Sequence, residues 1–245
     1  MCKTIVQVIT LIQQSIESRL EHLKEELQNL IDYPDEKFIN IIKELGFECN
    51  LCGKCCTIEF NDHVFLLNND TAAIKQIDAS ALIPAPYYEF CDQHGSFYVS
   101  GYALKTDPDG SCFFLDENKR CQIYDQRLTI CRIYPYMLHR EADEEGNIDW
   151  RQISGLNEHG FYHTEIDDSK CRQIASETKD YEIAFLEHEI EFLRAIRAYF
   201  MNNKLKHVQR TYDAGIREFK KGKEIEVFVY YNGRFEKNIV TIHDY

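Results

Sequence analysis

The chain has 245 residues, of which 44% are apolar, and it carries a formal charge of −13 at pH 7. This apolar fraction fits one folded domain, or one core with added elements, and argues against disorder. The negative charge would be repelled by phosphates, so a nucleic-acid partner is not expected. No apolar run reaches the length of a membrane span, and no cleavage site for export follows the short apolar run from Ile5 to Ile12. We therefore expect a cytoplasmic protein with no membrane partner.

Two long helices and one short helix are predicted from apolar residues spaced three and four apart. The first long helix runs from Ile5 to Leu30, and the short helix, from Glu36 to Leu45, should end at Gly46. The second long helix runs from Lys179 to Asn203, and its two apolar stripes make a wide face that must be buried. The long helices could pack antiparallel on each other or on a partner chain, so a homo-oligomer is one alternative.

The segment between the long helices is predicted to form short strands and turns. Thr57 to Leu67 alternates in part, and Phe97 to Leu104 is typical of a strand. Asp70 is the predicted N-cap of a short helix that runs to Ile77. The sequence Asp107-Pro108-Asp109-Gly110 predicts a turn that delivers the cysteine at position 112.

The C-terminal tail predicts a β-hairpin, because Asn232-Gly233 separates two alternating runs and favours a type I′ turn. The fold class expected from these elements is α+β, with a cysteine-ligated metal domain of short strands and loops between long terminal helices. We expect three parts: an N-terminal helical segment over 1–46, the metal domain over 47–172, and the C-terminal helix and hairpin over 173–245.

Eight of the ten cysteines form one pattern: Cys49, Cys52, Cys55, Cys56, Cys112, Cys121, Cys131 and Cys171. Packing does not require four thiols within eight residues, since alanine or valine fills the same space. In a reducing compartment, clustered cysteines are more often metal ligands or redox groups than disulfides. Thiolates select zinc, cuprous copper or iron–sulfur clusters. Cys2 and Cys91 are expected to be ordinary thiols.

The first four cysteines contain two overlapping C-x-x-C pairs, a spacing that zinc and iron–sulfur proteins both use. Cys49, Cys52 and Cys55 have the spacing that opens a bacterial ferredoxin motif. Cys56 departs from that motif, because it follows Cys55 directly. Neighbouring side chains of an extended backbone point to opposite faces. The vicinal pair can therefore serve two different metals, unless a turn redirects one of the two thiols.

Three further cysteines lie nine and ten residues apart, so the chain must fold back to deliver each of them. With Cys171 the thiols number eight, which is enough for two four-coordinate sites or for a cluster and a zinc ion. Arginines at positions 120, 127, 132 and 172 could offset thiolate charge or lie on the solvated surface. The scattered histidines are given no ligand role.

The run C-x-x-C-x-x-C-C, the following V-F-L-L-N-N-D-T, and D-G-S-C-F-F-L…R-C-Q-I-Y-D-Q-R-L-T-I-C-R-I-Y-P resemble the cysteine-cluster (CxxCxxCC) family of zinc- or iron-chelating domains. The resemblance covers about residues 47 to 138. It maps the family's seven cysteines onto the first seven of the eight above, and Cys171 lies beyond it. Leu128 stands where the family pattern has proline. The flagellin lysine-N-methylases resemble the same cysteine arrangement, which implies that such a scaffold can support protein modification.

The preferred hypothesis is an iron–sulfur protein, with a four-iron, four-sulfide (4Fe-4S) cluster and redox or protein-modifying activity; whether it is an enzyme stays open. Cys49, Cys52 and Cys55 would be primary ligands, and the fourth would be Cys56 or one of the Cys112 to Cys131 group. The remaining thiols could hold zinc or a second iron. One alternative is a structural zinc protein that presents its helices to a partner; another is an S-adenosylmethionine-dependent protein lysine methylase. A protein partner or protein substrate is expected, and no catalytic residue is assigned.

Overall fold

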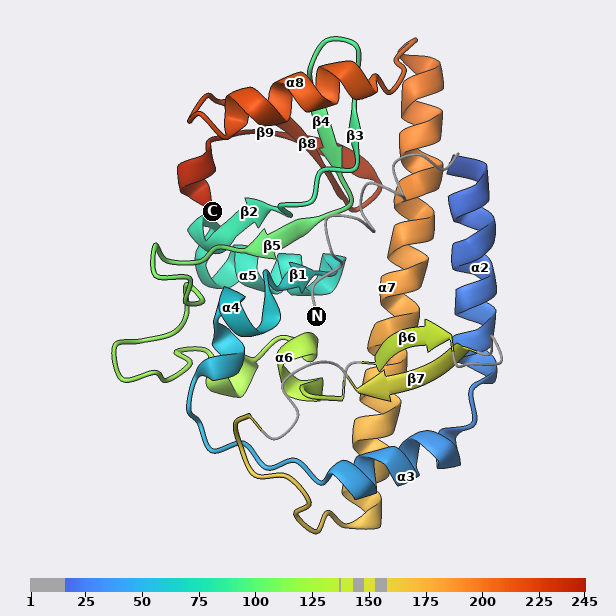
Figure 1. Ribbon diagram of the computed structural model, residues 1–245, viewed down its shortest axis with the longest axis vertical. Coiled ribbons are helices and arrows are strands. Elements are labelled where there is room, and N and C mark those ends of the chain that lie inside the picture. The colour runs from blue at the N-terminus through green and yellow to red at the C-terminus, as the bar shows by residue number, and fades with distance from the viewer. Residues whose placement is uncertain (1–15, 137, 143–147, 153–157) are drawn as a thin grey trace.

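The computed structural model describes residues 16–136, 138–142, 148–152 and 158–245. Helices and strands are mixed, as an α+β chain requires: most of the strands and several short helices lie on one side of the long helix α7 (Asp168–Asn202), and helix α2 (Ile16–Asp32) lies on the other (Figure 1). The α-helices are α2 (Ile16–Asp32), α3 (Asp35–Leu45), α4 (Ile58–Asn61), α5 (Asn68–Asp78), α6 (Thr129–Ile133), α7 (Asp168–Asn202) and α8 (Gln209–Phe219). Single 3-10 turns are η1 (Lys54–Cys56), η2 (Ala79–Ala81), η3 (Tyr124–Gln126) and η4 (Ile242–Asp244).

The strands form two small sheets and a separate ribbon. They are β1 (Phe65–Leu66), β2 (Leu82–Pro84), β3 (Phe90–Cys91), β4 (Phe97–Val99), β5 (Tyr102–Leu104), β6 (Leu138–Ala142), β7 (Ile148–Gln152), β8 (Ile225–Tyr231) and β9 (Arg234–Val240). The first sheet has the order β1-β5-β2, the second has the order β3-β4-β8-β9, and β6 pairs with β7. Pairing is antiparallel except between β4 and β8, which run parallel with Phe97 opposite Val227.

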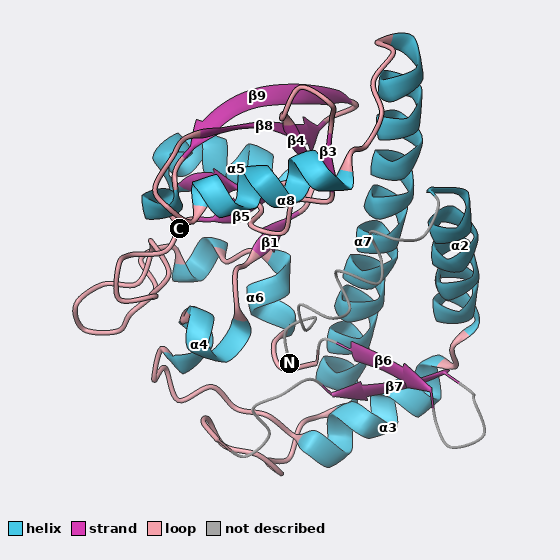
Figure 2. Cartoon of the chain, turned by 45° about the horizontal axis from the view of Figure 1, so that its top comes forward, coloured by secondary structure: helices cyan, strands magenta, loops and turns pink. Residues whose placement is uncertain are grey.

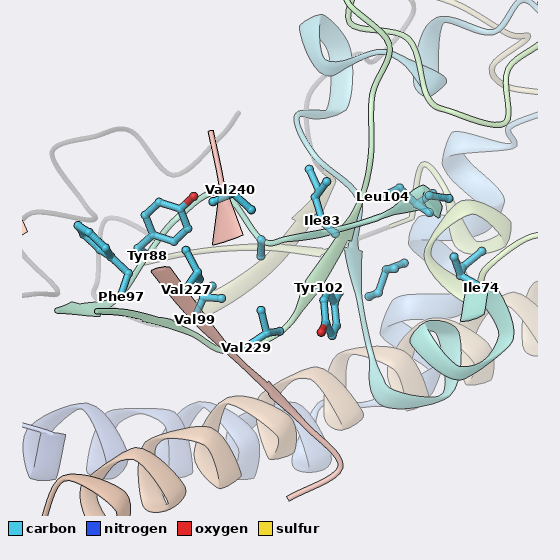
Figure 3. Packing of buried hydrophobic residues seen from close by; sticks show 14 of the residues in the cluster. Ile74, Ile83, Tyr88, Phe97, Val99, Tyr102, Leu104, Val227, Val229 and Val240 are labelled. Atoms are coloured by element: carbon cyan, nitrogen blue, oxygen red, sulfur yellow. The ribbon is translucent and has the colours of Figure 1, made fainter. Parts of the chain in front are cut away.

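The main core lies where the two sheets, α5 and α8 meet (Figure 3). Phe97, Val99 and Val227 are fully buried there, and burial of each such side chain contributes about 1.5–3 kcal/mol. Helix α8 lies across the second sheet and approaches it closely at Gly215, where a Cβ would meet the Phe97 ring at 2.6 Å. A second core joins α2, α3 and α7, and a third joins α7 to the second sheet.

The long helices α2 and α7 run antiparallel and lie side by side within one chain (Figures 1 and 2). The helix predicted from Ile5 is observed over Ile16–Asp32, and its earlier part falls outside the described residues. The short helix is confirmed as α3, whose end at Gly46 has a left-handed φ of 46° and an N–H bonded to the Ile42 carbonyl. Helix α7 begins at Asp168, well before Lys179, because the Asp167 carboxylate caps the Lys170 N–H at 2.9 Å.

Two segments that were predicted as continuous strands are each interrupted in the structure, so these predictions are wrong. Within Thr57 to Leu67, the residues Ile58–Asn61 form a helix and only Phe65–Leu66 is a strand. The run Phe97 to Leu104 breaks at Ser100-Gly101, so its two halves belong to different sheets. Gly101 is required at this break, since a Cβ would meet the Phe65 ring at 2.7 Å.

The predicted hairpin is confirmed as β8 and β9, and both turn residues, Asn232 and Gly233, have the positive φ of a type I′ turn. Helix α8 and the β6-β7 ribbon were not predicted. The proposed boundary at residue 172 falls inside α7, and the division into three parts stays a prediction. Within the described ranges, no helix combines the length and the apolar composition needed to cross a bilayer.

Candidate metal centre

The first cysteine loop leaves the end of α3 and is held in place by backbone contacts. Glu48 pairs with Phe161 through two hydrogen bonds of 2.8 and 2.9 Å, and the Tyr136 hydroxyl accepts the Phe47 N–H at 2.9 Å. The loop then turns at Leu51 and Gly53, which have φ values of 57° and 75°, and enters η1. These turns bring Cys49, Cys52 and Cys55 to a cavity that residues of α6 also line.

Gly46 connects the end of α3 to this loop. A Cβ at Gly46 would lie 2.1 Å from the Thr164 carbonyl oxygen, and Gly46 has a left-handed φ. Gly46→Ala should therefore cost about 2–4 kcal/mol of unfolding free energy and weaken metal retention. The matched control is Gly233→Ala, which has a similar φ but open space around its Cβ and should cost about 1–2 kcal/mol. Urea denaturation of both variants measures the difference, and equal costs would contradict the prediction.

The second cysteine segment pairs directly with the first. The predicted turn is observed, with the Gly110 N–H bonded to the Asp107 carbonyl at 2.8 Å. The Cys112 N–H then donates to the Cys56 carbonyl at 2.8 Å, which fixes these two cysteines side by side. A tight turn returns the chain to Cys121, and Arg120 Nη1 donates to the Leu51 carbonyl at 3.1 Å, which ties the two loops together.

Cys131 lies on the short helix α6, which packs on α7. The prediction that Asp70 caps its own helix is wrong, because α5 begins at Asn68 with Leu67 at the N-cap. The Asp70 carboxylate instead accepts the backbone N–H of Thr129, the first residue of α6. Burial raises the pKa of Asp70, whereas that hydrogen bond and Arg132 act in the opposite direction. Asp70 thus holds the helix that carries Cys131.

Three of the sulfurs receive a backbone N–H from two residues further along the chain. Leu51 N–H donates to Cys49 Sγ at 3.4 Å, and the N–H groups of Phe114 and Ile123 donate to Cys112 and Cys121. Such bonds favour the charged thiolate over the thiol. They are the kind of outer contact that orients sulfur ligands around a metal.

Four thiols form a group in which every member acts electrostatically on the other three. These are Cys56, Cys112, Cys121 and Cys131, and all six pairs interact. We call them the quartet. Burial raises the pKa of Cys112 to about 12 and raises those of Cys121 and Cys131, and the charge of Cys56 adds to each rise. A cation among the four sulfurs would reverse this penalty.

The adjacent cysteines Cys55 and Cys56 differ in their electrostatic interactions. Cys55 donates its S–H to Cys56, which lowers the pKa of Cys56 to about 7 with help from Arg127 and raises that of Cys55. Cys56 belongs to the quartet, whereas Cys55 interacts electrostatically with Cys49 as well as with Cys56 and Cys131. We call Cys49, Cys52 and Cys55 the triad.

Two neighbouring cavities are lined by the cysteines of the triad and the quartet. The first, about 370 Å³, is lined by the whole triad, by Cys131, and by Arg127, Arg132 and Tyr134. The second, about 230 Å³, is lined by the whole quartet and by His63. Cys49, Cys55 and Cys131 line both cavities, Cys52 lines only the first, and the other three quartet cysteines line only the second.

The seven thiols form no disulfides, and neighbouring N–H and guanidinium groups offset thiolate charge. This donor set fits a soft metal. In the described part of the chain, no three Cys, His, Asp or Glu side chains converge into a finished metal site. Electrostatic interaction acts over longer distances than a metal–sulfur bond of about 2.3 Å. A metal would therefore have to draw the sulfurs inward.

Cys171 lies apart from the other seven. It is fully buried on α7 among Phe38, Ile42 and Tyr136, and its S–H lies 3.7 Å from the Ile166 carbonyl. Burial raises the pKa of this thiol. Its predicted ligand role stays a prediction. Cys91 is also buried, with its S–H 3.6 Å from the Asp92 carbonyl, and Cys2 falls outside the described residues.

Of the four arginines near the cysteines in sequence, Arg127 lies close enough to lower the pKa of both Cys56 and Cys121. Arg172 instead forms an ion pair with Glu36 of α3 at 2.7 Å. Leu128, which replaces the family's proline, is buried and has φ −56°, a value that proline also adopts. The backbone at this position is therefore one that proline could also adopt.

Three other residues around the centre have no role at the metal site that could be predicted from the sequence. Asp70 has no motif that connects it to α6, and His63 lies in the second cavity with Nδ1 buried and no hydrogen-bond partner among the described residues. No role for Tyr134 follows from the sequence alone. A signal that could have indicated Tyr134 is its position three residues after Cys131, one helical turn from a ligand candidate.

Comparison with known proteins identifies the middle of the chain. Residues 48–154 match the CxxCxxCC family model, described as "Putative zinc- or iron-chelating domain". An uncharacterized protein of Methanocaldococcus jannaschii is 29% identical over 101 residues, which cover 41% of this chain. The match spans about half of that relative (50%), and no solved structure matches the chain significantly. The match over residues 48–154, which hold all seven clustered cysteines, therefore supports the resemblance to the CxxCxxCC family.

Proposed function

We propose that the protein binds metal at two adjacent thiolate sites and that one of them holds an iron–sulfur cluster. The observation that carries the proposal is the division of the seven thiols into a mutually interacting quartet and a C-x-x-C-x-x-C triad. The vicinal cysteines Cys55 and Cys56 lie on the two sides of this division. Both parts use only residues inside the segment that matches the family.

The quartet suits a closed site that stabilises the loops. Four cysteine ligands complete the tetrahedral coordination of zinc, and the same set also holds iron. Its members come from η1, the two turns after Gly110, and α6, so one ion would cross-link segments that share little regular structure. This site corresponds to the zinc or second iron expected beside the cluster.

The triad suits a 4Fe-4S cluster, because its spacing is that of the ferredoxin motif. When bound, such a cluster supplies electron transfer, or Lewis acidity where one iron lacks a protein ligand. The fourth ligand would be Cys131, which lines the same cavity, or no cysteine at all if Cys131 remains with the quartet. Arg127 and Arg132 would offset the negative charge of the occupied site.

The function that follows is a cytoplasmic iron–sulfur protein with redox or protein-modifying activity on a protein partner. A structural zinc protein is the second candidate, and the four-cysteine donor set of the quartet favours it. The exposed apolar side chains of Leu51, Ile58 and Tyr124 around the cysteine loops would serve a protein partner in either case.

Anaerobic purification followed by analysis of iron, zinc and acid-labile sulfide separates these candidates. The proposal expects brown protein with a broad absorption band at about 400 nm and about four irons and four sulfides per chain. A second ion, zinc or iron, should accompany them. Colourless protein that holds zinc alone, even after reconstitution with iron and sulfide, would support the structural zinc protein and overturn the cluster.

A further inference from the structure

Tyr134 stands at the wall between the two cavities. It follows α6 directly and lines both cavities together with Cys55. Its ring is held from two directions, by Phe47 with centroids 5.9 Å apart and by His159 at 5.3 Å. These contacts fix the direction of the ring and leave little freedom for its hydroxyl.

The Tyr134 hydroxyl is buried and has no hydrogen-bond partner in the described ranges. Buried hydroxyls without a partner are rare, because leaving one unsatisfied costs about 1–3 kcal/mol. Cys52 and Cys55 lie near it, yet neither sulfur is within hydrogen-bond reach. Tyr136, two residues further, has a satisfied hydroxyl that accepts the Phe47 N–H.

We infer that the Tyr134 hydroxyl donates a hydrogen bond to a sulfur of the iron–sulfur cluster held by the triad. The inference rests on the proposed function. The missing acceptor would be an inorganic sulfide in the 370 Å³ cavity, or a triad thiolate drawn inward by iron. A phenol keeps its proton at neutral pH, so it offers a donor and no competing negative charge. Tyr134 is thus a positioning residue that affects the midpoint potential and the retention of the cluster.

A donor to sulfur stabilises the electron-rich reduced state of a cluster and strengthens its retention. Tyr134→Phe removes only the hydroxyl and keeps the ring contacts with Phe47 and His159. In anaerobically reconstituted protein it should lower the midpoint potential and weaken iron retention against a chelator by about 10- to 100-fold. The iron and sulfide content before the challenge should equal that of the wild type.

The matched control is Tyr212→Phe, which deletes a hydroxyl on α8 that donates to the Tyr88 carbonyl at 3.0 Å and lines neither of the two cavities. It should leave the potential and the iron retention unchanged, although it can lower stability. A wild-type potential and wild-type iron retention in Tyr134→Phe would overturn the inference while the proposed function stands. Wild-type protein that takes up no iron and sulfide would overturn both.

Discussion

Cys56→Ala is expected to lose the ion of the quartet and to keep the chromophore of the triad. Cys56 interacts with all three other quartet members, and the Cys112 N–H bonds to its carbonyl. Binding of a structural metal contributes on the order of 10 kcal/mol to folding, so loss of a ligand should loosen the loops as well. Metal analysis should find one ion fewer per chain, and amide hydrogen exchange should rise between Cys112 and Cys131.

Cys55→Ala is expected to give the opposite result. Its sulfur lines the first cavity with Cys49 and Cys52, so the variant should lose the absorption near 400 nm while it keeps the quartet ion. The two substitutions are adjacent and identical in kind, and each serves as the control of the other. If both variants lost the same metal in the same amount, the seven thiols would form one site and the division would be wrong.

A third variant tests the eighth predicted ligand. Cys171→Ala removes a fully buried thiol whose charged neighbours are Lys43, Asp167 and Asp168. It should cost about 1 kcal/mol of stability by leaving a small cavity, with both metals retained. Loss of either metal would instead assign Cys171 a place in the site.

Local signals in the sequence were sufficient where neighbouring residues determine the conformation. Gly46 ends α3 and Asn232-Gly233 makes the hairpin turn, because glycine and asparagine adopt a left-handed φ at a lower conformational cost than other residues. The cysteine spacing likewise identified the family now found over residues 48–154. For the helix end and the hairpin turn, the information lies in the immediate neighbours of the feature.

Features that depend on distant contacts could not be predicted. The run Phe97 to Leu104 looks like one strand, but Gly101 packs on Phe65 and the chain changes sheets there. The parallel pairing of β4 with β8 joins segments more than a hundred residues apart. Asp70 has the composition of an N-cap, and only the tertiary fold directs its carboxylate to α6. The grouping of Cys56 with the later cysteines has the same origin.

The long helices are joined to the second sheet by an ion pair that no sequence motif indicated. Arg19 of α2 pairs with Glu89, and their side chains are only 9% and 16% exposed. The guanidinium also lies 5.4 Å from the centroid of the Phe90 ring. A buried charge is tolerated only while its partner is present, since each ion has lost most of its hydration.

Glu89→Ala should therefore lower the free energy of unfolding by about 3–5 kcal/mol, because Arg19 would remain buried without its counter-charge. Urea denaturation of the metal-loaded protein measures this loss. The double variant Arg19→Met/Glu89→Ala should recover part of it, since methionine keeps the apolar contact with Phe90 and carries no charge.

The matched control is Glu17→Ala on the same helix. Glu17 pairs with Arg197 of α7 at 3.6 Å, but the two side chains are 63% and 46% exposed. Water already solvates both charges, so the substitution should change the unfolding free energy by no more than about 1 kcal/mol. Equal losses for Glu17→Ala and Glu89→Ala would mean that burial of the Arg19 pair has no energetic consequence. The attachment of α2 to the sheet would then depend on apolar packing alone.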